Sequence, residues 1–469
     1  MKKLIFNILI LSVSFSLPAQ KTVELQSPDK MLEVEISVGE QLKYSLKHKG
    51  EILLYPSAIS MRLNEGKSFG IKSHLNKTTQ NKVNQIIESP FYKRSQIADN
   101  YNEVTLVFKE NFNLIFRVYN EGMAYRFVST GKTDFIVKNE EAQFELGTAS
   151  KAFIPYIRPS WLEKFDVFEN SFENIYTYQA ANEWKDNQFA FLPLVVERAN
   201  GKKICITEAD LENYPGMYLH NPSKENRLQG CFAPYPKKVG RGGYNNLQLL
   251  VKERETFIAQ CKAKTNFPWR IVIVSSSDKE LLDNDMVYKL ASPSKVDNIS
   301  WIQPGKAAWE WWNNLNLFNV DFVTGINNQT YKYYIDFASE HGIEYLFMDE
   351  GWSVQGADLF AVVPDINLKE LVDYAVQRNV GIILWAGYYL FDKDMEAVCR
   401  HYSEMGIKGF KVDFIERDDQ LAVDFHYRCA EMAAKYHLLL DFHGTYKPTG
   451  LQRTYPNVLN FEGVYGLEQ

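Results

Sequence analysis

The stretch Gly409-Phe410-Lys411-Val412-Asp413-Phe414 decides the fold class of the C-terminal part of the chain. It has the pattern of a short buried strand that carries a carboxylate, Asp413, at its carboxyl end. In a barrel of parallel strands, the carboxyl ends of the strands face the active site. We therefore predict that this stretch is a barrel strand and that Asp413 lies at the mouth of the barrel.

From Gly305 onward, strand-like and helix-like segments alternate. Short continuous apolar runs predict six strands, at Ala307–Trp312, Ile343–Asp349, Gly381–Ala386, Gly409–Phe414, Leu438–Phe442 and Val458–Phe461. Segments with helical periodicity lie between most of them, at Gln329–His341, Leu368–Arg378, Lys393–Met405 and Asp418–Tyr436. This alternation predicts a parallel sheet with helices outside it. Because no glycine-rich phosphate loop follows the first strand, we favour a (β/α)8-type barrel over a doubly wound sheet.

A complete barrel of this type needs eight strands, and about six are recognisable. Either two strands lie in segments whose pattern hides them, or the chain is a fragment, and we favour the fragment. We therefore expect an incomplete catalytic barrel at residues 305–469. An open barrel exposes strand edges and apolar faces, so we also hypothesise that the chain does not fold to an active enzyme. Normal turnover by the refolded chain would refute that hypothesis.

The N-terminal half follows a different pattern. From about Thr22 to Phe267, short runs of alternating apolar and polar residues, such as Leu32–Val38 and Glu103–Phe108, are broken by Gly, Asn and Pro. Period-two patterning with frequent turn residues predicts a large antiparallel β-sandwich. We place this domain at residues 21–285 and a helical linker at residues 286–304.

Residues 1–20 have the features of a secretory signal peptide. Lys2 and Lys3 supply the positive region, an apolar stretch runs from Leu4 to Leu17, and Ala19 is a small residue suited to cleavage. The alternative is a membrane anchor, but the apolar run is short for a span. No second long apolar run follows, so we expect a secreted or periplasmic protein without a stable membrane span in the mature chain.

The composition is that of a globular protein with two or more domains: 469 residues, of which 45% are hydrophobic and 23% charged. A net charge of −6 and the lack of a basic run argue against nucleic acid as a partner. The five cysteines are scattered and form no CxxC pair, so neither a metal cluster nor a disulfide framework is expected. Aromatic residues make up 14% of the chain, which suits sugar stacking but suits a sandwich core better.

Three acids carry the predicted chemistry. Lys411 precedes Asp413 by two residues and points to the same face of the strand, where a cation would keep the carboxylate ionised for a nucleophilic role; a structural Lys–Asp pair is the alternative. Glu462 and Glu468 lie in a later glycine-containing segment. Two carboxylates on separate strand ends are what glycoside hydrolysis requires. The later pair could also hold a hard cation, or lie unrelated in a solvated loop.

Four more residues at or near strand ends are candidate substrate contacts: Asp349, Trp311, His443 and Arg453. Acids and aromatic rings occur together in sugar sites. A histidine at a strand end can hydrogen-bond a sugar hydroxyl, although a purely structural histidine fits the pattern equally well. An exposed arginine is likewise the alternative to a substrate contact at Arg453.

Four segments, taken together and in order, resemble glycoside hydrolase family 97. They are Gly409–Phe414, Phe442–Gly450, Arg453–Asn457 and Phe461–Glu468. The resemblance implies a large N-terminal β-sandwich, a catalytic (β/α)8 barrel and a small C-terminal β domain. It also implies activity on α-glucosides or α-galactosides and the use of calcium.

The resemblance is to the retaining branch of that family. Inverting α-glucosidases of the family carry a base glutamate directly after the histidine of the fifth-strand motif, where this chain has Gly444. Retaining members, mainly α-galactosidases, carry an aspartate at the end of the fourth strand, which Asp413 matches. The resemblance therefore implies that Asp413 is the nucleophile and Glu468 the general acid/base, with the two carboxyl groups about 5–5.5 Å apart.

The resemblance also implies the other site residues. Glu462 and Glu468 would bind Ca²⁺ together with a glutamate of the N-terminal domain, for which Glu208 is the best match. Lys411 and His443 would contact the sugar. The leading interpretation is thus an exo-acting, retaining α-galactosidase whose substrate is an oligosaccharide or another α-glycoside. An α-glucosidase of the same family and a non-catalytic carbohydrate-binding protein remain alternatives.

Overall fold

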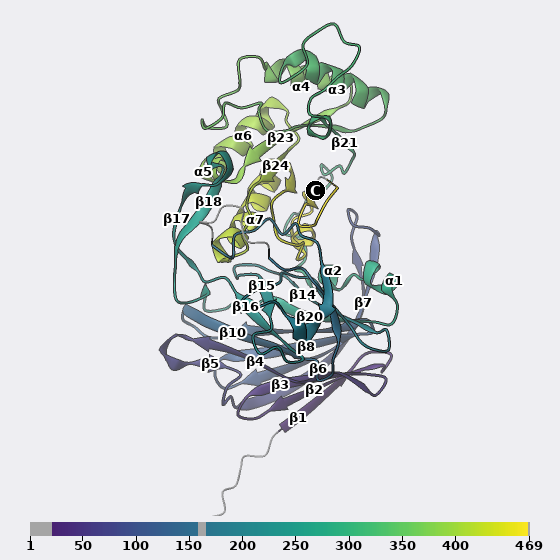
Figure 1. Cartoon of the computed structure of the whole chain (residues 1–469), viewed down its shortest axis with the longest axis vertical. Coiled ribbons are helices and arrows are strands. Elements are labelled where there is room, and N and C mark those ends of the chain that lie inside the picture. The colour runs from purple at the N-terminus through teal and green to yellow at the C-terminus, as the bar shows by residue number, and fades with distance from the viewer. Residues whose placement is uncertain (1–20, 158–165, 468–469) are drawn as a thin grey trace, which may run out of the picture.

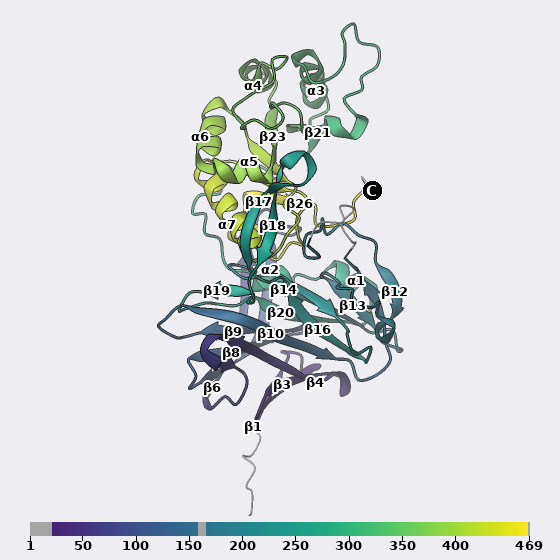
Figure 2. The ribbon, with the colours of Figure 1, turned by 60° about the vertical axis from the view of Figure 1, so that its left-hand side comes forward.

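The computed structural model describes residues 21–157 and 166–467 (Figure 1). The predicted signal peptide at residues 1–20 and the predicted acid/base Glu468 lie outside the described residues. The chain forms an N-terminal sandwich of two large sheets and a C-terminal parallel sheet with helices on its outer side (Figures 1 and 2).

Two nine-stranded antiparallel sheets form the sandwich. The first contains β1 (Lys21–Gln26), β2 (Leu32–Val38), β3 (Leu42–His48), β4 (Glu51–Leu63), β5 (Ser68–Phe69), β10 (Phe135–Glu145), β15 (Met217–His220), β16 (Arg227–Phe232) and β19 (Ala259–Cys261). The second contains β6 (Leu75–Glu88), β7 (Gln96–Phe108), β8 (Phe112–Tyr119), β9 (Gly122–Ser129), β11 (Lys151–Ile154), β12 (Thr177–Ala180), β13 (Leu194–Glu197), β14 (Lys203–Ala209) and β20 (Trp269–Ser275).

The alternating sequence pattern explains why these strands form a sandwich. In β2 every second residue is fully buried, and β8 shows the same alternation. Each sheet therefore presents one apolar face to the core between the sheets, as aligned sandwiches do. The predicted antiparallel sandwich is confirmed.

One pair of strands within the predicted sandwich range does not belong to the sandwich. The strands β17 (Pro236–Gly242) and β18 (Gln248–Arg254) form a separate two-stranded sheet. This hairpin leaves the sandwich and runs alongside the helices of the C-terminal sheet (Figures 1 and 2). Two short helices, α1 (Asp278–Leu282) and α2 (Met286–Leu290), then precede the connection to the C-terminal part.

Six parallel strands form the C-terminal sheet in sequence order: β21 (Ala307–Trp309), β22 (Tyr345–Met348), β23 (Gly381–Gly387), β24 (Gly409–Asp413), β25 (Leu439–Phe442) and β26 (Val458–Phe461). The helices are α3 (Asn328–Glu340), α4 (Leu368–Val376), α5 (Tyr388–Lys393), α6 (Met395–Met405), α7 (Gln420–Lys435) and α8 (Leu451–Thr454). All five residues of β24 are buried, because helices cover one face and the curled sheet encloses the other. The predicted incomplete (β/α)8-type barrel is confirmed as a half-barrel of six strands in the described residues.

Helix starts in the half-barrel follow capping rules. The side chains of Asn327, Asn367 and Asp419 each accept a backbone N–H of the first turn of α3, α4 and α7. Two predicted elements differ from the structure. The first predicted strand ends at Trp309, where the short 3₁₀ helix η4 (Glu310–Asn313) begins, and the predicted helix Lys393–Met405 is divided at Asp394 between α5 and α6. No helix in the described part of the chain combines the length and apolarity needed to cross a bilayer.

Candidate active site

The side chains that point into the half-barrel form layers across neighbouring strands. The strand register aligns one layer from β23 to β26: Trp385, Lys411, Asp441 and Asn460. Below this layer, toward the amino ends of the strands, lies an apolar cluster that contains Tyr345, Ile383 and Leu439. Because side chains alternate along a strand, the next layer up contains Asp413 on β24. Polar groups therefore gather at the carboxyl ends, where barrel enzymes carry their active sites.

Three donors hold the carboxylate of Asp413, which is 9% exposed. Trp385 Nε1 lies 3.1 Å from Oδ2, and Lys411 Nζ lies 3.5 Å from the same oxygen. The backbone N–H of Phe414 donates to Oδ1 at 2.7 Å. The carboxylate therefore has a fixed orientation at the end of β24, as the sequence pattern predicts for a reacting group.

Lys411 lies between two acids. Its ammonium donates to Asp349 Oδ2 at 2.8 Å, lies 3.5 Å from Asp413 Oδ2, and sits 4.6 Å from the centre of the Trp309 ring. Burial opposes the charged form, but the negative charges of Asp413 and Asp349 prevail and raise the pKa of Lys411. Lys411 is thus a permanently cationic bridge between the two carboxylates.

Asp349 is held from the opposite side by β21 and η4. Trp309 Nε1 donates to Asp349 Oδ2 at 2.6 Å, and the Asp349 backbone N–H donates to Glu310 Oε1 at 2.7 Å. Burial raises the pKa of Glu310 to about 7. Trp311, the tryptophan predicted to contact substrate, is 48% exposed, and it is Trp309 that contacts Asp349 and Lys411. The alternation assumed for a strand stops at Trp309, because η4 turns the backbone there.

His443 joins the group from the end of β25. Its Nε2 lies 3.2 Å from Asp441 Oδ2, and its Nδ1 lies 3.1 Å from Glu462 Oε2. Burial opposes protonation, but the charge of Asp441 and the hydrogen bonds to both acids raise the pKa of His443 to about 10. The imidazolium therefore donates from both nitrogens near neutral pH. Ligand atoms of Asp413, His443 and Glu462 lie within 4.8 Å of one another.

Glu462 is the described residue that best fits a calcium ion at this position. Its Oε2 accepts the backbone N–H of Gly444 at 3.0 Å and contacts His443, while its Oε1 makes no hydrogen bond to the described residues. Ca²⁺ takes oxygen ligands, so Oε1 of Glu462 is a suitable donor. His443 is not, because both of its nitrogens donate to acids.

Glu208 lies in a different cluster. It is fully buried on β14, where Oε1 accepts from Met217 N at 3.0 Å and from Lys447 Nζ, and Oε2 accepts from Arg270 Nη1. Arg270 also forms two hydrogen bonds with Glu140, at 2.7 and 2.8 Å. Both oxygens of Glu208 are thus occupied by cationic partners. The structure thus places Glu208 in a buried ion-pair cluster that links the sandwich to the loop after β25, and its role as a calcium ligand stays a prediction.

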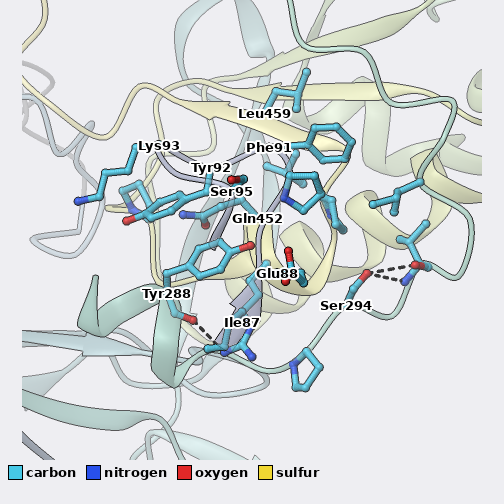
Figure 3. Close-up of a pocket in the computed structure, with 18 of the residues that line it drawn as sticks. Ile87, Glu88, Phe91, Tyr92, Lys93, Ser95, Tyr288, Ser294, Gln452 and Leu459 are labelled. Atoms are coloured by element: carbon cyan, nitrogen blue, oxygen red, sulfur yellow. Dashed lines mark hydrogen bonds between the residues drawn. The ribbon is translucent and has the colours of Figure 1, made fainter. Parts of the chain in front are cut away.

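Arg453 has a structural position. Its Nη1 donates to the backbone carbonyls of Tyr288, Lys289 and Ala291 at 3.0, 2.7 and 2.7 Å, at the C-terminal end of α2. Arg453 also lines a cavity of about 660 Å³, in which Tyr92 stacks on Tyr288 and Phe91 lies near Leu459 (Figure 3). Of the residues predicted to form the site, this cavity touches Arg453 alone. The structure thus shows Arg453 as a cap on α2, and the sugar contact at Arg453 stays a prediction.

Two further acids at the mouth were not among the predicted site residues. Glu350, next to Asp349, accepts from Asn245 Nδ2 at 3.0 Å, and burial raises the pKa of Glu350. Glu416, three residues after Asp413, accepts from Gln248 Nε2 at 2.6 Å, and burial, with smaller contributions from nearby acids, raises the pKa of Glu416 to about 7. Because both acids follow the carboxyl ends of strands, their positions in the sequence could have been used to predict that they lie at the mouth. Their partners on the β17–β18 hairpin were not foreseeable, because they come from another domain.

Comparison with known proteins gives consistent matches across both parts of the chain. The family model described as "Glycosyl-hydrolase 97 N-terminal" matches residues 25–293, and the model "Glycoside hydrolase 97" matches residues 309–464. A retaining alpha-galactosidase of Bacteroides thetaiotaomicron is 53% identical over 471 residues, which cover 100% of this chain and 71% of that protein. A probable retaining alpha-galactosidase of Streptomyces bingchenggensis is 26% identical over 453 residues, which cover 94% of this chain and 64% of that protein.

Solved structures share the fold. A glycoside hydrolase family 97 enzyme from Pseudoalteromonas sp. strain K8, in complex with acarbose, superposes with a TM-score of 0.81 at 22% identity, over 95% of this chain and 70% of that one. A beta-arabinopyranosidase superposes with a TM-score of 0.77 at 22% identity, over the same shares of the two chains. At this level of identity the similarity concerns the fold alone.

Proposed function

Since the chain belongs to glycoside hydrolase family 97 and is a glycosidase, we propose that it is a retaining, exo-acting α-galactosidase with Asp413 as the nucleophile and Glu468 as the general acid/base. The observation that carries this proposal is the position of Asp413. Its carboxylate faces the mouth from the end of β24, held by Trp385, Lys411 and the Phe414 N–H.

The surroundings of Gly444 support a nucleophile on β24 rather than a base at residue 444. Gly444 has a φ of +49°, and an added Cβ would lie 3.1 Å from Phe414 N and 3.4 Å from Asp413 Oδ1. A larger side chain at residue 444 would therefore press on the backbone that orients Asp413. A large side chain at residue 444 and an oriented Asp413 would therefore occupy the same space. This chain has glycine at residue 444 and the aspartate on β24.

The reaction proceeds in two steps. Asp413 attacks the anomeric carbon, the bond to the leaving oxygen breaks, and Glu468 gives that oxygen its proton. Glu468 then takes a proton from water, whose oxygen attacks the anomeric carbon and releases Asp413. Two inversions give net retention. Lys411 and Asp349 bind and orient sugar hydroxyls, since they supply a cationic donor and an acceptor beside the reacting position. His443 contacts a hydroxyl when that hydroxyl replaces Asp441 or Glu462 as the acceptor of one of its two N–H groups.

The proposal includes Ca²⁺ bound by Glu462 and Glu468. When bound, the ion orients the reacting sugar and stabilises negative charge that develops beside it. Removing the ion with a chelator should lower turnover, and added Ca²⁺ should restore it. Calorimetric titration of Ca²⁺ into the chelator-treated chain should show binding that Glu462→Gln weakens. Unchanged turnover in chelator together with no binding heat would contradict the calcium assignment.

We also propose that residues 1–20 direct export to the periplasm or the medium. Sequencing of the exported protein should then show an N-terminus close to residue 20.

The proposed activity is tested by hydrolysis of p-nitrophenyl α-galactoside and p-nitrophenyl α-glucoside, with the first sugar anomer followed by NMR. If the incomplete barrel folds to an active enzyme, against the hypothesis drawn from its open edge, we expect turnover of the galactoside and initial release of α-galactose. Preference for the glucoside would keep the mechanism and change the substrate. Initial release of the β-anomer would contradict retention, and turnover of neither substrate would contradict the proposed activity.

A further inference from the structure

A hairpin of the N-terminal domain reaches the mouth of the half-barrel (Figures 1 and 2). Its tip, η3 (Tyr244–Asn246), connects β17 and β18. The centre of the Tyr244 ring lies 5.3 Å from that of Phe414, the residue directly after Asp413. Asn245 Nδ2 donates to Glu350 Oε1 at 3.0 Å, beside Asp349. The tip therefore contacts the strand end that carries the proposed nucleophile Asp413 and the strand end that carries Asp349.

The hairpin is fastened to the half-barrel below its tip. The Tyr389 N–H donates to the Leu247 carbonyl at 2.8 Å, and Gln248 Nε2 donates to Glu416 Oε2 at 2.6 Å. Arg417, fully buried, donates to the Leu249 carbonyl. These contacts fix the backbone just after the tip relative to α5 and the loop after β24, which lowers the cost of ordering the tip around a ligand.

The turn at the tip presents Tyr244 to solvent. Gly243 has a φ of +74°, and a Cβ at that position would lie 1.6 Å from Gln248 Oε1, which accepts the Tyr244 N–H at 3.2 Å. Tyr244 is 44% exposed, and its hydroxyl makes no hydrogen bond to the residues that the structure describes. The ring is tilted by 39° against Phe414, and its exposed part is available to a ligand.

We infer that Tyr244, together with Glu350 as positioned by Asn245, forms a subsite for the second sugar ring of an oligosaccharide, the ring that leaves when the glycosidic bond is broken. This inference rests on the proposed function. The first sugar lies at Asp413, Lys411 and Asp349, inside the mouth, so the leaving sugar lies outside it.

The chemistry of the tip suits a sugar. An aromatic ring with a polar edge packs on the apolar face of a pyranose and can hydrogen-bond its hydroxyls. The Glu350 carboxylate accepts hydrogen bonds from hydroxyl groups. A pocket with aromatic walls and a few fixed polar groups is the usual form of a small-ligand site.

The test compares a substrate whose leaving group has no ring with one that has a second sugar: α-galactosyl fluoride and an α-1,6-linked galactosyl-glucose disaccharide. For Tyr244→Ala we expect the KM for the disaccharide to rise about three- to tenfold. We expect kcat/KM for the fluoride to change by less than about twofold, because the first sugar is untouched. Tyr244→Phe should restore most of the disaccharide affinity. Tyr333→Ala is the matched control, because Tyr333 is a comparably exposed tyrosine (42%) on α3.

Asn245→Ala should raise the KM for the disaccharide in the same direction, because Glu350 loses its partner. An equal loss on both substrates would overturn the subsite and indicate damage to the catalytic groups. An unchanged KM for the disaccharide in Tyr244→Ala would also overturn it.

A binding measurement separates this inference from the proposed activity. The disaccharide is titrated into Asp413→Asn and into Asp413→Asn/Tyr244→Ala, and the dissociation constants are compared. If the wild-type chain hydrolyses neither substrate but Tyr244→Ala weakens binding, the subsite stands and the proposed activity fails. Equal dissociation constants in the two variants would overturn the subsite whatever the turnover.

Discussion

Asp413 and Lys411 lie at one face of β24, as their two-residue spacing indicates, and the structure adds Trp385 as a third partner. When Asp413 is replaced, the ammonium of Lys411 keeps Asp349 as its ion-pair partner. The proposed role of Asp413 can therefore be tested separately from the fold.

Asp413→Gly should reduce turnover at least about 10⁴-fold, since the nucleophile is lost while the rest of the site remains. Azide should restore part of the activity by occupying the vacated space, and the product should be the β-galactosyl azide, which NMR identifies. Unchanged circular dichroism would show that the fold persists. Substantial residual turnover without azide would mean that another group is the nucleophile.

At the scale of single residues, the spacing of residues along one strand predicted which side chains share a face. Contacts between residues far apart in the sequence could not be predicted in this way. These residues lie at or just after the carboxyl ends of barrel strands and meet at the mouth: Asp413, Lys411, Asp349, His443 and Glu462. Trp311 was predicted as an aromatic residue near a strand end, and the strand ends two residues earlier, at Trp309. Glu208 could not be judged from sequence, because its partners Arg270 and Lys447 approach it only in the folded chain. Glu468 stays a prediction.

At the scale of elements, β14 connects to the half-barrel through the Glu208–Lys447 pair. Glu208→Ala should lower the free energy of unfolding by about 3–5 kcal/mol, because Lys447 would be left buried with an unpaired charge and Arg270 would keep only Glu140 as its acidic partner. Chemical denaturation measures this change. The control is Asp373→Ala in the exposed Lys369–Asp373 pair of α4, for which about 0.5 kcal/mol or less is expected. Equal effects of the two substitutions would show that the buried pair does not stabilise the fold.

All six parallel strands were recognisable, because a strand buried on both faces gives a continuous apolar run that few other elements give. The β17–β18 hairpin was assigned to the sandwich, because its period-two pattern is the same as that of the sandwich strands. A strand pattern identifies the element and leaves its partner sheet undefined. The hairpin packs against α5 and the loop after β24 through contacts with residues far along the chain, which the local sequence pattern cannot predict.

At the scale of the whole molecule, acids buried between the parts of the chain make stability depend on pH. Asp418 is fully buried: it accepts from the Tyr218 hydroxyl at 2.7 Å, and its carbonyl accepts the Gly216 N–H at 2.8 Å. Burial raises the pKa of Asp418 to about 7. Between the ordinary pKa of 3.8 and 7, the folded state binds more protons than the unfolded state. The contribution of Asp418 to stability is therefore present at low pH and is lost as the pH rises through this window.

Asp418→Asn removes this titration while keeping the shape of the side chain. Relative to wild type, the variant should gain stability as the pH rises from 5 to 8, by an amount on the order of a few kcal/mol. Melting temperatures of both proteins across that range measure the change. Asp424→Asn, a partly exposed aspartate on α7, is the control and should track wild type. A difference between Asp418→Asn and wild type that is constant with pH would contradict the assignment.

Because the β17–β18 hairpin is anchored below its tip, mutations that change the entrance to the site and mutations that change the catalytic groups fall in different parts of the gene. Residues 243–246 form a short surface turn, held at Leu247, Gln248 and Leu249 by contacts that do not involve the turn itself. Mutation or loop exchange within these four codons reshapes the entrance, while the codons for β22 and β24, which lie more than 90 residues later, stay untouched. Natural selection or protein engineering can therefore change the substrate specificity of this enzyme without changing its catalytic residues.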